Sequence, residues 1–167
     1  MQNDEHSSLP APTLHFVMRI RVDVADPLEL GEIHGAAKRI IRITGGSFEG
    51  PSLRGKVLDG GADWQTTRPD RVAVLYARGT LKTDSGELIA LENRGFRHGP
   101  PDLAARIAAG ERVPPSEYYF MTTPVFETAA PELQWLTRTI FVGQAEREKS
   151  CVIVNVWRVG GELRPED

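Results

Sequence analysis

RVAVLYARGTLKTDSGELIALENRGF, residues 71–96, is the most informative stretch for the fold of this chain. It contains two apolar runs of the length and composition that favour strands. Between them stands Asp84-Ser85-Gly86, and glycine readily takes the positive φ that tight hairpin turns require. The stretch therefore predicts two long antiparallel strands joined by a short turn.

Similar runs lie on both sides of this hairpin. Strict alternation over residues 13–24 predicts a strand with Leu14, Phe16, Met18 and the three apolar residues after them on one face. Further extended runs cover 39–47, 52–65, 117–128, 136–148 and 150–159. The glycine pair at 60–61 predicts a bulge or bend within 52–65. Residues 26–37, which proline and glycine interrupt, predict a loop.

The whole pattern predicts an all-β fold, a single antiparallel β-barrel of about eight strands. A closed barrel is favoured over a flat sandwich because closure removes exposed strand edges. One short helix is expected near 101–110, with Pro101 in its first turn and Gly110 at its C-terminal end. We expect residues 13–160 to form the barrel domain, 1–12 a disordered leader, and 161–167 a loose tail.

Composition excludes several classes of function. The 167 residues carry 20 basic and 23 acidic side chains, a net charge of −3, so a nucleic-acid partner is not expected. No apolar run reaches the roughly 18 residues of a membrane span, and the polar start lacks the pattern of a secretion signal. The single cysteine, Cys151, fits a reducing cytoplasm. The histidines lack metal-ligand spacing and no nucleotide fingerprint is present, so neither metal nor cofactor is expected.

The segment 52–65 carries three candidate site residues. Arg54 stands mid-strand, where an inward guanidinium could hold a ligand carboxylate or enolate with two parallel hydrogen bonds; the alternative is a surface arginine. Asp63 is a candidate general base, because a dry site would raise the pKa of its carboxyl towards neutrality. A turn-capping aspartate is the competing interpretation. Trp64 beside it offers an apolar wall.

Strands further along the chain supply the other candidates. Asn93 shares its face with Ile89 and Leu91, so we expect it to point inward and donate a hydrogen bond to a ligand carbonyl. One tyrosine of the pair at 118–119 is expected in the pocket as a hydrogen-bond donor or general acid, and we predict that it is Tyr119. An aromatic core with the hydroxyl at the rim is the alternative.

Two charged residues and a tryptophan complete the predicted site. Glu127 ends a strand and is a second candidate for proton transfer. Arg138 lies between Leu136 and Ile140 and is predicted to be buried, paired with Glu127 or Asp63. Trp135 would add an apolar wall to the same pocket.

Residues 45–65, GGSFEGPSLRGKVLDGGADWQ, resemble the DUF3237 family, also called the UPF0311 proteins. Further matches are LKTDSGELIALENRGFRHGPP (81–101), PSEYYFMTTPVFETAAP (115–131) and LQWLTRTIFVGQAERE (133–148), so the resemblance extends over about 13–159. It implies a compact antiparallel barrel similar to the calycin and allene-oxide-cyclase barrels. It implies no settled activity.

Three functions compete for such a barrel. The first is a cofactor-free isomerase, cyclase or lyase acting by general acid/base chemistry on a small apolar carbonyl or phenolic compound. The second is a non-catalytic, lipocalin-like protein that binds a small apolar or aromatic ligand. The third is a scaffold with a filled interior. A catalyst needs a carboxyl group that points into the cavity and is not held by an arginine in a bidentate ion pair. Exposed edges or apolar faces could support a homodimer.

Overall fold

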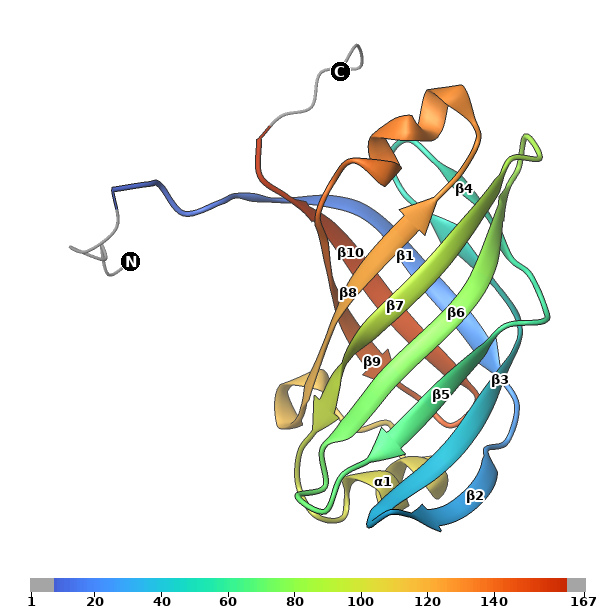
Figure 1. Ribbon diagram of the computed structural model, residues 1–167, viewed down its shortest axis with the longest axis vertical. Coiled ribbons are helices and arrows are strands. Elements are labelled where there is room, and N and C mark those ends of the chain that lie inside the picture. The colour runs from blue at the N-terminus through green and yellow to red at the C-terminus, as the bar shows by residue number, and fades with distance from the viewer. Residues whose placement is uncertain (1–7, 162–167) are drawn as a thin grey trace.

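The computed structural model describes residues 8–161, and within them the chain forms ten strands and one α-helix. The strands are β1 (Leu14–Val24), β2 (Leu28–Ile33), β3 (Ala36–Glu49), β4 (Arg54–Val57), β5 (Ala62–Thr67), β6 (Ala73–Thr83), β7 (Leu88–His98), β8 (Tyr119–Glu127), β9 (Phe141–Arg147) and β10 (Cys151–Val159). Figure 1 shows them wound into a barrel. The predicted leader lies largely outside the described residues, and so does all of the predicted tail except Gly161.

Every strand pairing is antiparallel, and the pairings close on themselves. The order runs β1-β10-β9-β8-β7-β6-β4-β3, and β3 pairs again with β1. β5 occupies the same place as β4, between β3 and β6, because the strand predicted over 52–65 is interrupted at residues 58–61. β2 likewise continues β1 along the same side of β3, so the ten strands fill eight positions of a closed barrel, which confirms the predicted fold.

The seam between β1 and β3 closes the barrel, and it depends on Gly46. This residue lies opposite Val22 and has a φ of +136°. A Cβ placed on it would lie 2.0 Å from the carbonyl oxygen of Arg21. Only glycine lets the two backbones approach this closely.

The prediction of a loop over 26–37 is wrong. These residues contain β2, which forms a hairpin with β3 around His34 and Gly35, both at positive φ (53° and 80°). A two-residue turn of this kind matches the natural twist of a hairpin. β2 is exposed along its whole length, so the sequence shows no buried face that could have marked it as a strand.

The alternation in the first strand is also shifted at its start. The β1–β10 register slips between Phe16 and Met18, so Val17 and Met18 are both buried. Leu14 and Phe16 consequently lie exposed on the outer side, whereas Met18 and Ile20 belong to the core. A β-bulge of this kind re-aims every side chain on one side of it.

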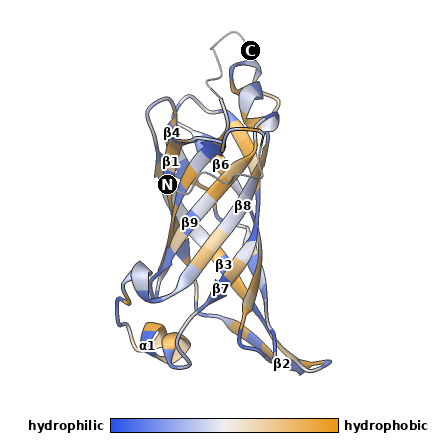
Figure 2. Cartoon of the chain, turned by 90° about the vertical axis from the view of Figure 1, so that its left-hand side faces the viewer, coloured by the Kyte–Doolittle hydropathy of each residue, from blue (hydrophilic) through white to orange (hydrophobic). Residues whose placement is uncertain are grey.

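Helical segments lie at the two ends of the barrel. The predicted helix is α1 (Leu103–Ala108), which buries Leu103 and Ile107. The 3-10 helix η2 (Pro131–Thr137) buries Leu133 and Leu136. Figure 1 shows α1 at the lower end and the orange η2 at the upper end, and Figure 2 shows the β2 hairpin projecting below the barrel wall. No helix among residues 8–161 has the length and apolar character needed to cross a bilayer.

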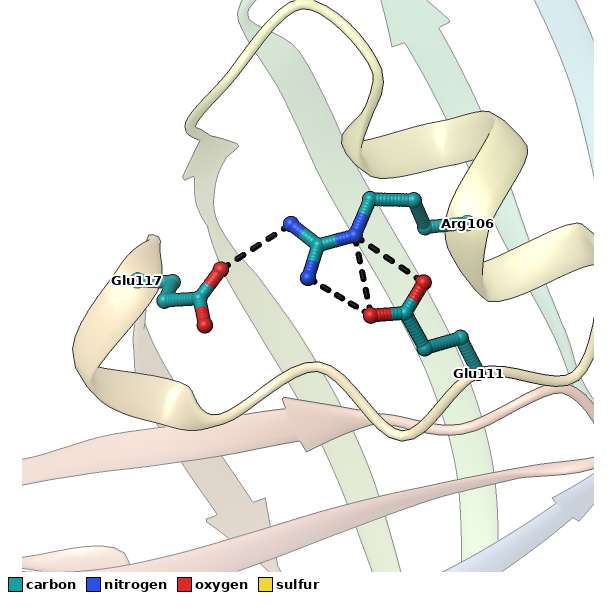
Figure 3. A network of polar contacts seen from close by, with 3 residues as sticks. All are labelled: Arg106, Glu111 and Glu117. Carbon is teal, nitrogen blue, oxygen red and sulfur yellow. Dashed lines mark hydrogen bonds and ion pairs between the residues drawn. The ribbon is translucent and has the colours of Figure 1, made fainter.

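The connection from α1 to β8 is held by one arginine. Arg106 donates to both carboxylate oxygens of Glu111, with distances of 2.6 to 3.0 Å, and its Nη1 donates to Glu117 in η1 (Pro115–Glu117) at 2.9 Å (Figure 3). This two-sided ion pair ties α1 to the start of β8. It thereby fixes the segment that covers the lower end of the barrel.

Candidate functional site

The barrel interior contains a cavity between the two capped ends. It offers about 80 Å³ to the centre of a water-sized molecule. One water needs roughly 10–15 Å³ on this measure, so several waters or a small ligand fit. Most of the wall is aliphatic and comes from β1, β3, β6 and β10. Its polar side chains are Asp63, Gln65, Arg78, Asn93, Arg97, Thr122 and Arg147, with Thr80 adding a hydroxyl.

Asp63 faces this cavity from β5. Its Oδ1 accepts a hydrogen bond from the backbone N–H of Tyr76 (2.9 Å), and its Oδ2 accepts one from Gln65 Nε2 (3.3 Å). Burial raises the pKa of Asp63, and the Tyr76 hydrogen bond and the charge of Arg97 offset only part of that rise. The carboxyl is therefore shifted towards the neutral range in which a general base works best.

Gln65 lies between Asp63 and Arg39 and is hydrogen-bonded to both. It is buried two residues along β5, so it shares the inner face with Asp63. Its Oε1 accepts a bond of 2.6 Å from Arg39 Nε, while its amide nitrogen donates to Asp63. The Asp63 carboxylate thus accepts a hydrogen bond from a neutral amide and not from an arginine, so it can still take up and release a proton.

Two buried arginines face the same cavity. Arg97 on β7 is 7% exposed and Arg147 at the end of β9 is 5% exposed. The Arg97 guanidinium lies 5.5 Å from the ring centre of Phe120, and Arg147 Nη1 donates to the Cys151 carbonyl at 3.4 Å. Burial, together with the charges of Arg39 and Arg147, lowers the pKa of Arg97 to about 10, so it remains charged at neutral pH.

Two further polar atoms in the cavity wall are unsatisfied. Asn93 Oδ1 and Thr122 Oγ1 are buried and have no hydrogen-bond partner among the described residues. Asn93 projects from β7 and Thr122 from β8, in adjacent strands. Buried polar atoms are normally paired with protein or water, so these two atoms mark where a ligand or water would bind.

Of the eight predicted site residues, the structure brings Asp63 and Asn93 together in the cavity. Trp64 lies on the outer face of β5, 46% exposed, with its ring 6.4 Å from Tyr76. Tyr119 is 48% exposed and stacks on His98 at 4.9 Å. The buried member of the tyrosine pair is Tyr118, whose hydroxyl oxygen accepts the Arg147 N–H at 2.9 Å. The expectation that Trp64 and Tyr119 line the interior is thus corrected.

Two predicted arginines also lie outside the interior. Arg54 is exposed on β4, opposite Glu49 of β3, because its inward neighbours are Leu53 and Val57. Arg138 is exposed at the end of η2, so its predicted burial is corrected. The alternation that placed Arg138 inward does not apply, because residues 131–137 form a 3-10 helix and not a strand.

Trp135 and Glu127 also lie outside the cavity in which they were expected. Trp135 is half-buried on η2 and packs beside Phe141, with ring centres 6.2 Å apart, away from the cavity. Glu127 is exposed at the end of β8, where it borders an outer groove together with Trp64. Among residues 8–161, no group of three or more His, Cys, Asp or Glu side chains is placed to hold a metal ion.

The sequence contains a pattern that could have identified the three buried residues that the prediction missed. Arg97 is four positions after Asn93, so the alternation that turns Asn93 inward also turns Arg97 inward. Gln65 follows Asp63 by two positions, and Arg147 shares a face with Phe141 and Ala145. These residues were missed because charged and amide side chains are ordinarily assigned to solvent.

Comparison with known proteins places the chain in a family. A UPF0311 protein of Rhodopseudomonas palustris (strain TIE-1) is 40% identical over 150 residues, which cover 89% of this chain and 98% of that protein. A β-barrel-like protein from Acinetobacter baumannii AYE has a TM-score of 0.79 at 39% identity, covering 93% of this chain and 99% of that one. An enzyme from Penicillium herquei, at 17% identity and a TM-score of 0.69 over 92% of this chain and 98% of that one, shares the fold.

The family model described as a protein of unknown function (DUF3237) matches residues 12–159, which include every strand and the whole cavity. The matched region and the identity to the UPF0311 protein together exceed what a shared fold alone would give. The chain therefore belongs to the DUF3237 family of UPF0311 proteins.

Proposed function

We propose that this protein is a cofactor-free enzyme, an isomerase, cyclase or lyase, that moves a proton on a small carbonyl or phenolic compound held in the barrel. The observation that carries the proposal is the state of Asp63. Its carboxyl faces a cavity inside the barrel, burial raises its pKa, and its hydrogen bonds come from an amide side chain and a backbone N–H. A carboxyl clamped by an arginine would be held ionised and would be a poor base.

The proposed step uses residues that line the cavity. Ionised Asp63 removes a proton from the carbon beside the substrate carbonyl, or from a phenolic hydroxyl. The electron pair moves to the oxygen, and the resulting enolate or phenolate is stabilised by the Arg97 and Arg147 guanidiniums and the Asn93 amide. The protonated Asp63 can exchange its proton with water in the cavity, and it then donates one proton to a different atom, so that one proton is removed, one is returned and no cofactor is needed.

The closed wall would contribute by excluding bulk water. Electrostatic interactions strengthen when water is removed, so the arginines act more strongly on a developing oxyanion here than at a surface. The likeness to the Penicillium herquei enzyme is support of a limited kind: a barrel of this fold occurs in an enzyme.

A lipocalin-like binding protein is the alternative. The observation in its favour is the largely aliphatic wall, which suits retention of an apolar compound without chemistry. The two functions differ in whether bound compounds exchange protons with Asp63, and that difference can be measured directly.

The test is deuterium exchange in D₂O. Purified protein is incubated with a panel of small ketones and phenols, and incorporation of deuterium into their carbon positions is followed by mass spectrometry. We expect wild type to accelerate exchange in at least one compound. Asp63→Asn should abolish the acceleration while affinity for that compound stays within about tenfold, because the isosteric amide retains the shape of the site.

Asp84→Asn is the matched control, since Asp84 is exposed in the turn between β6 and β7. It should exchange like wild type. Binding without any acceleration by wild type would favour the lipocalin-like alternative, and exchange that persists in Asp63→Asn would remove Asp63 from the role.

A further inference from the structure

The distribution of ion pairs among the arginines is unusual. Several arginines that are exposed or only partly buried are paired with a carboxylate: Arg21 with Asp23, Arg94 with Glu92, Arg106 with Glu111, and Arg112 with Glu146. The two buried arginines, Arg97 and Arg147, form no ion pair with any carboxylate among residues 8–161. This is the reverse of the usual arrangement, because an unpaired charge costs most where it is buried.

The charges that face the cavity do not balance. Among the buried or half-buried side chains of its wall, Arg97 and Arg147 contribute two positive charges and Asp63 contributes at most one negative charge; Arg78, which also lines the cavity, is exposed to solvent. Arg39 adds a third guanidinium nearby, although its charge is partly met by Glu29 at 3.7 Å and its Nε bonds Gln65. Repulsion among these guanidiniums, together with burial, lowers the pKa of both Arg97 and Arg147. The interior therefore carries an excess positive charge that an anion would neutralise.

The position of these side chains gives an anion a way to reach them. Arg97 and Arg147 line the cavity and also a groove beside α1, which Ala104 and Ile107 line together with the charged residues Asp26, Arg39 and Lys149. The guanidiniums thus stand between the groove and the cavity at the α1 end of the barrel. Further inside, Asn93 Oδ1 and Thr122 Oγ1 lack partners among the described residues, as would suit a ligand with a hydroxyl group beyond its charged end.

We propose that the natural ligand is a small organic acid, whose carboxylate binds Arg97 and Arg147 and whose apolar or hydroxylated body fills the cavity towards Asn93. The inference deepens the function proposed above and rests on it for the reaction, since it narrows the carbonyl or phenolic substrate to one that also carries a carboxylate. Guanidinium and carboxylate match in charge and in bidentate geometry, and the aliphatic wall suits the rest of the molecule.

The first measurement compares acids with neutral analogues of the same shape. Benzoate, 4-hydroxybenzoate and pentanoate are each titrated into wild-type protein by calorimetry, alongside their primary amides. We expect at least one acid to bind about tenfold or more tightly than its amide, the difference expected for a charge-assisted contact in a dry site. If no acid binds more tightly than its amide, the inference is overturned, and no variant is needed to reach that result.

The second measurement assigns the contact to the buried arginines. Arg97→Met and Arg147→Met should remove the preference for the acid, whereas Arg94→Met, on β7 like Arg97 but exposed, should keep it. Without ligand, Arg97→Met should unfold at the same temperature as wild type or higher, because methionine relieves a buried unpaired charge. A large fall in its unfolding temperature, with the acid preference retained, would show a structural arginine and overturn the inference.

The two proposals fail separately. Acid binding that depends on Arg97, without deuterium exchange in any compound, would contradict the enzymatic function and support the anion site. Exchange that depends on Asp63 but occurs only in neutral compounds would support the enzymatic function and overturn the anion site.

Discussion

Asp63 is the residue on which the chemistry of this barrel depends. Folding moves its carboxyl next to an apolar cavity, and loss of hydration disfavours the ionised form. The N–H of Tyr76 and the amide of Gln65 compensate only in part. The residue is consequently a site where the fold gives up some stability at neutral pH, which is common where a group must exchange protons.

The raised pKa predicts a specific dependence of stability on pH. The folded state binds the Asp63 proton more tightly than the unfolded state, so this residue stabilises the fold below the usual carboxyl pKa, and that contribution disappears as pH rises through the raised value. A tenfold difference in proton affinity between the two states corresponds to about 1.4 kcal/mol. Asp63→Asn, which does not titrate, should therefore gain stability relative to wild type as the pH rises from the usual carboxyl pKa through the raised pKa of Asp63, and the difference should stay constant above that.

Urea unfolding at several pH values measures this difference. Asp84→Asn serves as the control, because Asp84 is exposed in the turn between β6 and β7. A difference between Asp63→Asn and wild type that stays constant over the whole range would mean that folding leaves the Asp63 pKa unchanged.

The strand elements are held in a closed ring by the β1–β3 seam, and Gly46 makes that seam possible. Gly46→Ala should destabilise the protein by about 3 kcal/mol or more. The new Cβ would clash with the Arg21 carbonyl oxygen, and alanine would also have to adopt the unfavourable positive φ. Gly86→Ala is the matched control. Gly86 also has a positive φ, of +104°, but a Cβ placed on it would have no atom within 4 Å, so only the backbone cost of about 1–2 kcal/mol applies.

Chemical denaturation of the two variants separates the steric effect from the conformational one. Gly46→Ala should have the lower free energy of unfolding. Equal losses in the two variants would show that the seam can open to admit a methyl group, and the closed ring would then be less constrained than its register indicates.

The elements differ in how far the sequence could predict them. The β6–β7 hairpin was predictable, because both strands have one buried face and the turn carries its own glycine. β2 was not, because a strand without a buried face leaves no alternation to detect. The strand predicted over 136–148 begins five residues too early, in the last two residues of η2, and Arg138 was turned inward as a result.

The site was predictable only where alternation was combined with the expected chemistry. Alternation and the expected chemistry both assigned Asp63 and Asn93 to the interior. Arg97 and Arg147 follow the same alternation, but hydropathy assigns arginine to solvent, and only the closed ring shows that their faces point into a shared interior. Closure itself joins β1 to β3, which no local pattern encodes.

Considered as a whole, the molecule is a closed wall around a small interior whose charges are incompletely balanced. The wall is largely aliphatic, α1 and η2 lie at its two ends, and a few polar side chains face the interior. Both proposals depend on this enclosure, because an Asp63 in contact with bulk water would titrate like any surface carboxyl.

The enclosure is therefore best tested by titrating the Asp63 carboxyl carbon by ¹³C NMR, with its signal assigned from its absence in Asp63→Asn. We predict that Asp63 titrates clearly above the exposed aspartates of the same protein, and that the addition of an acid ligand raises its pKa further by placing a second negative charge nearby. A titration that coincides with, or falls below, that of the exposed aspartates would show that the interior is not shielded from bulk water, and both proposals would lose their basis.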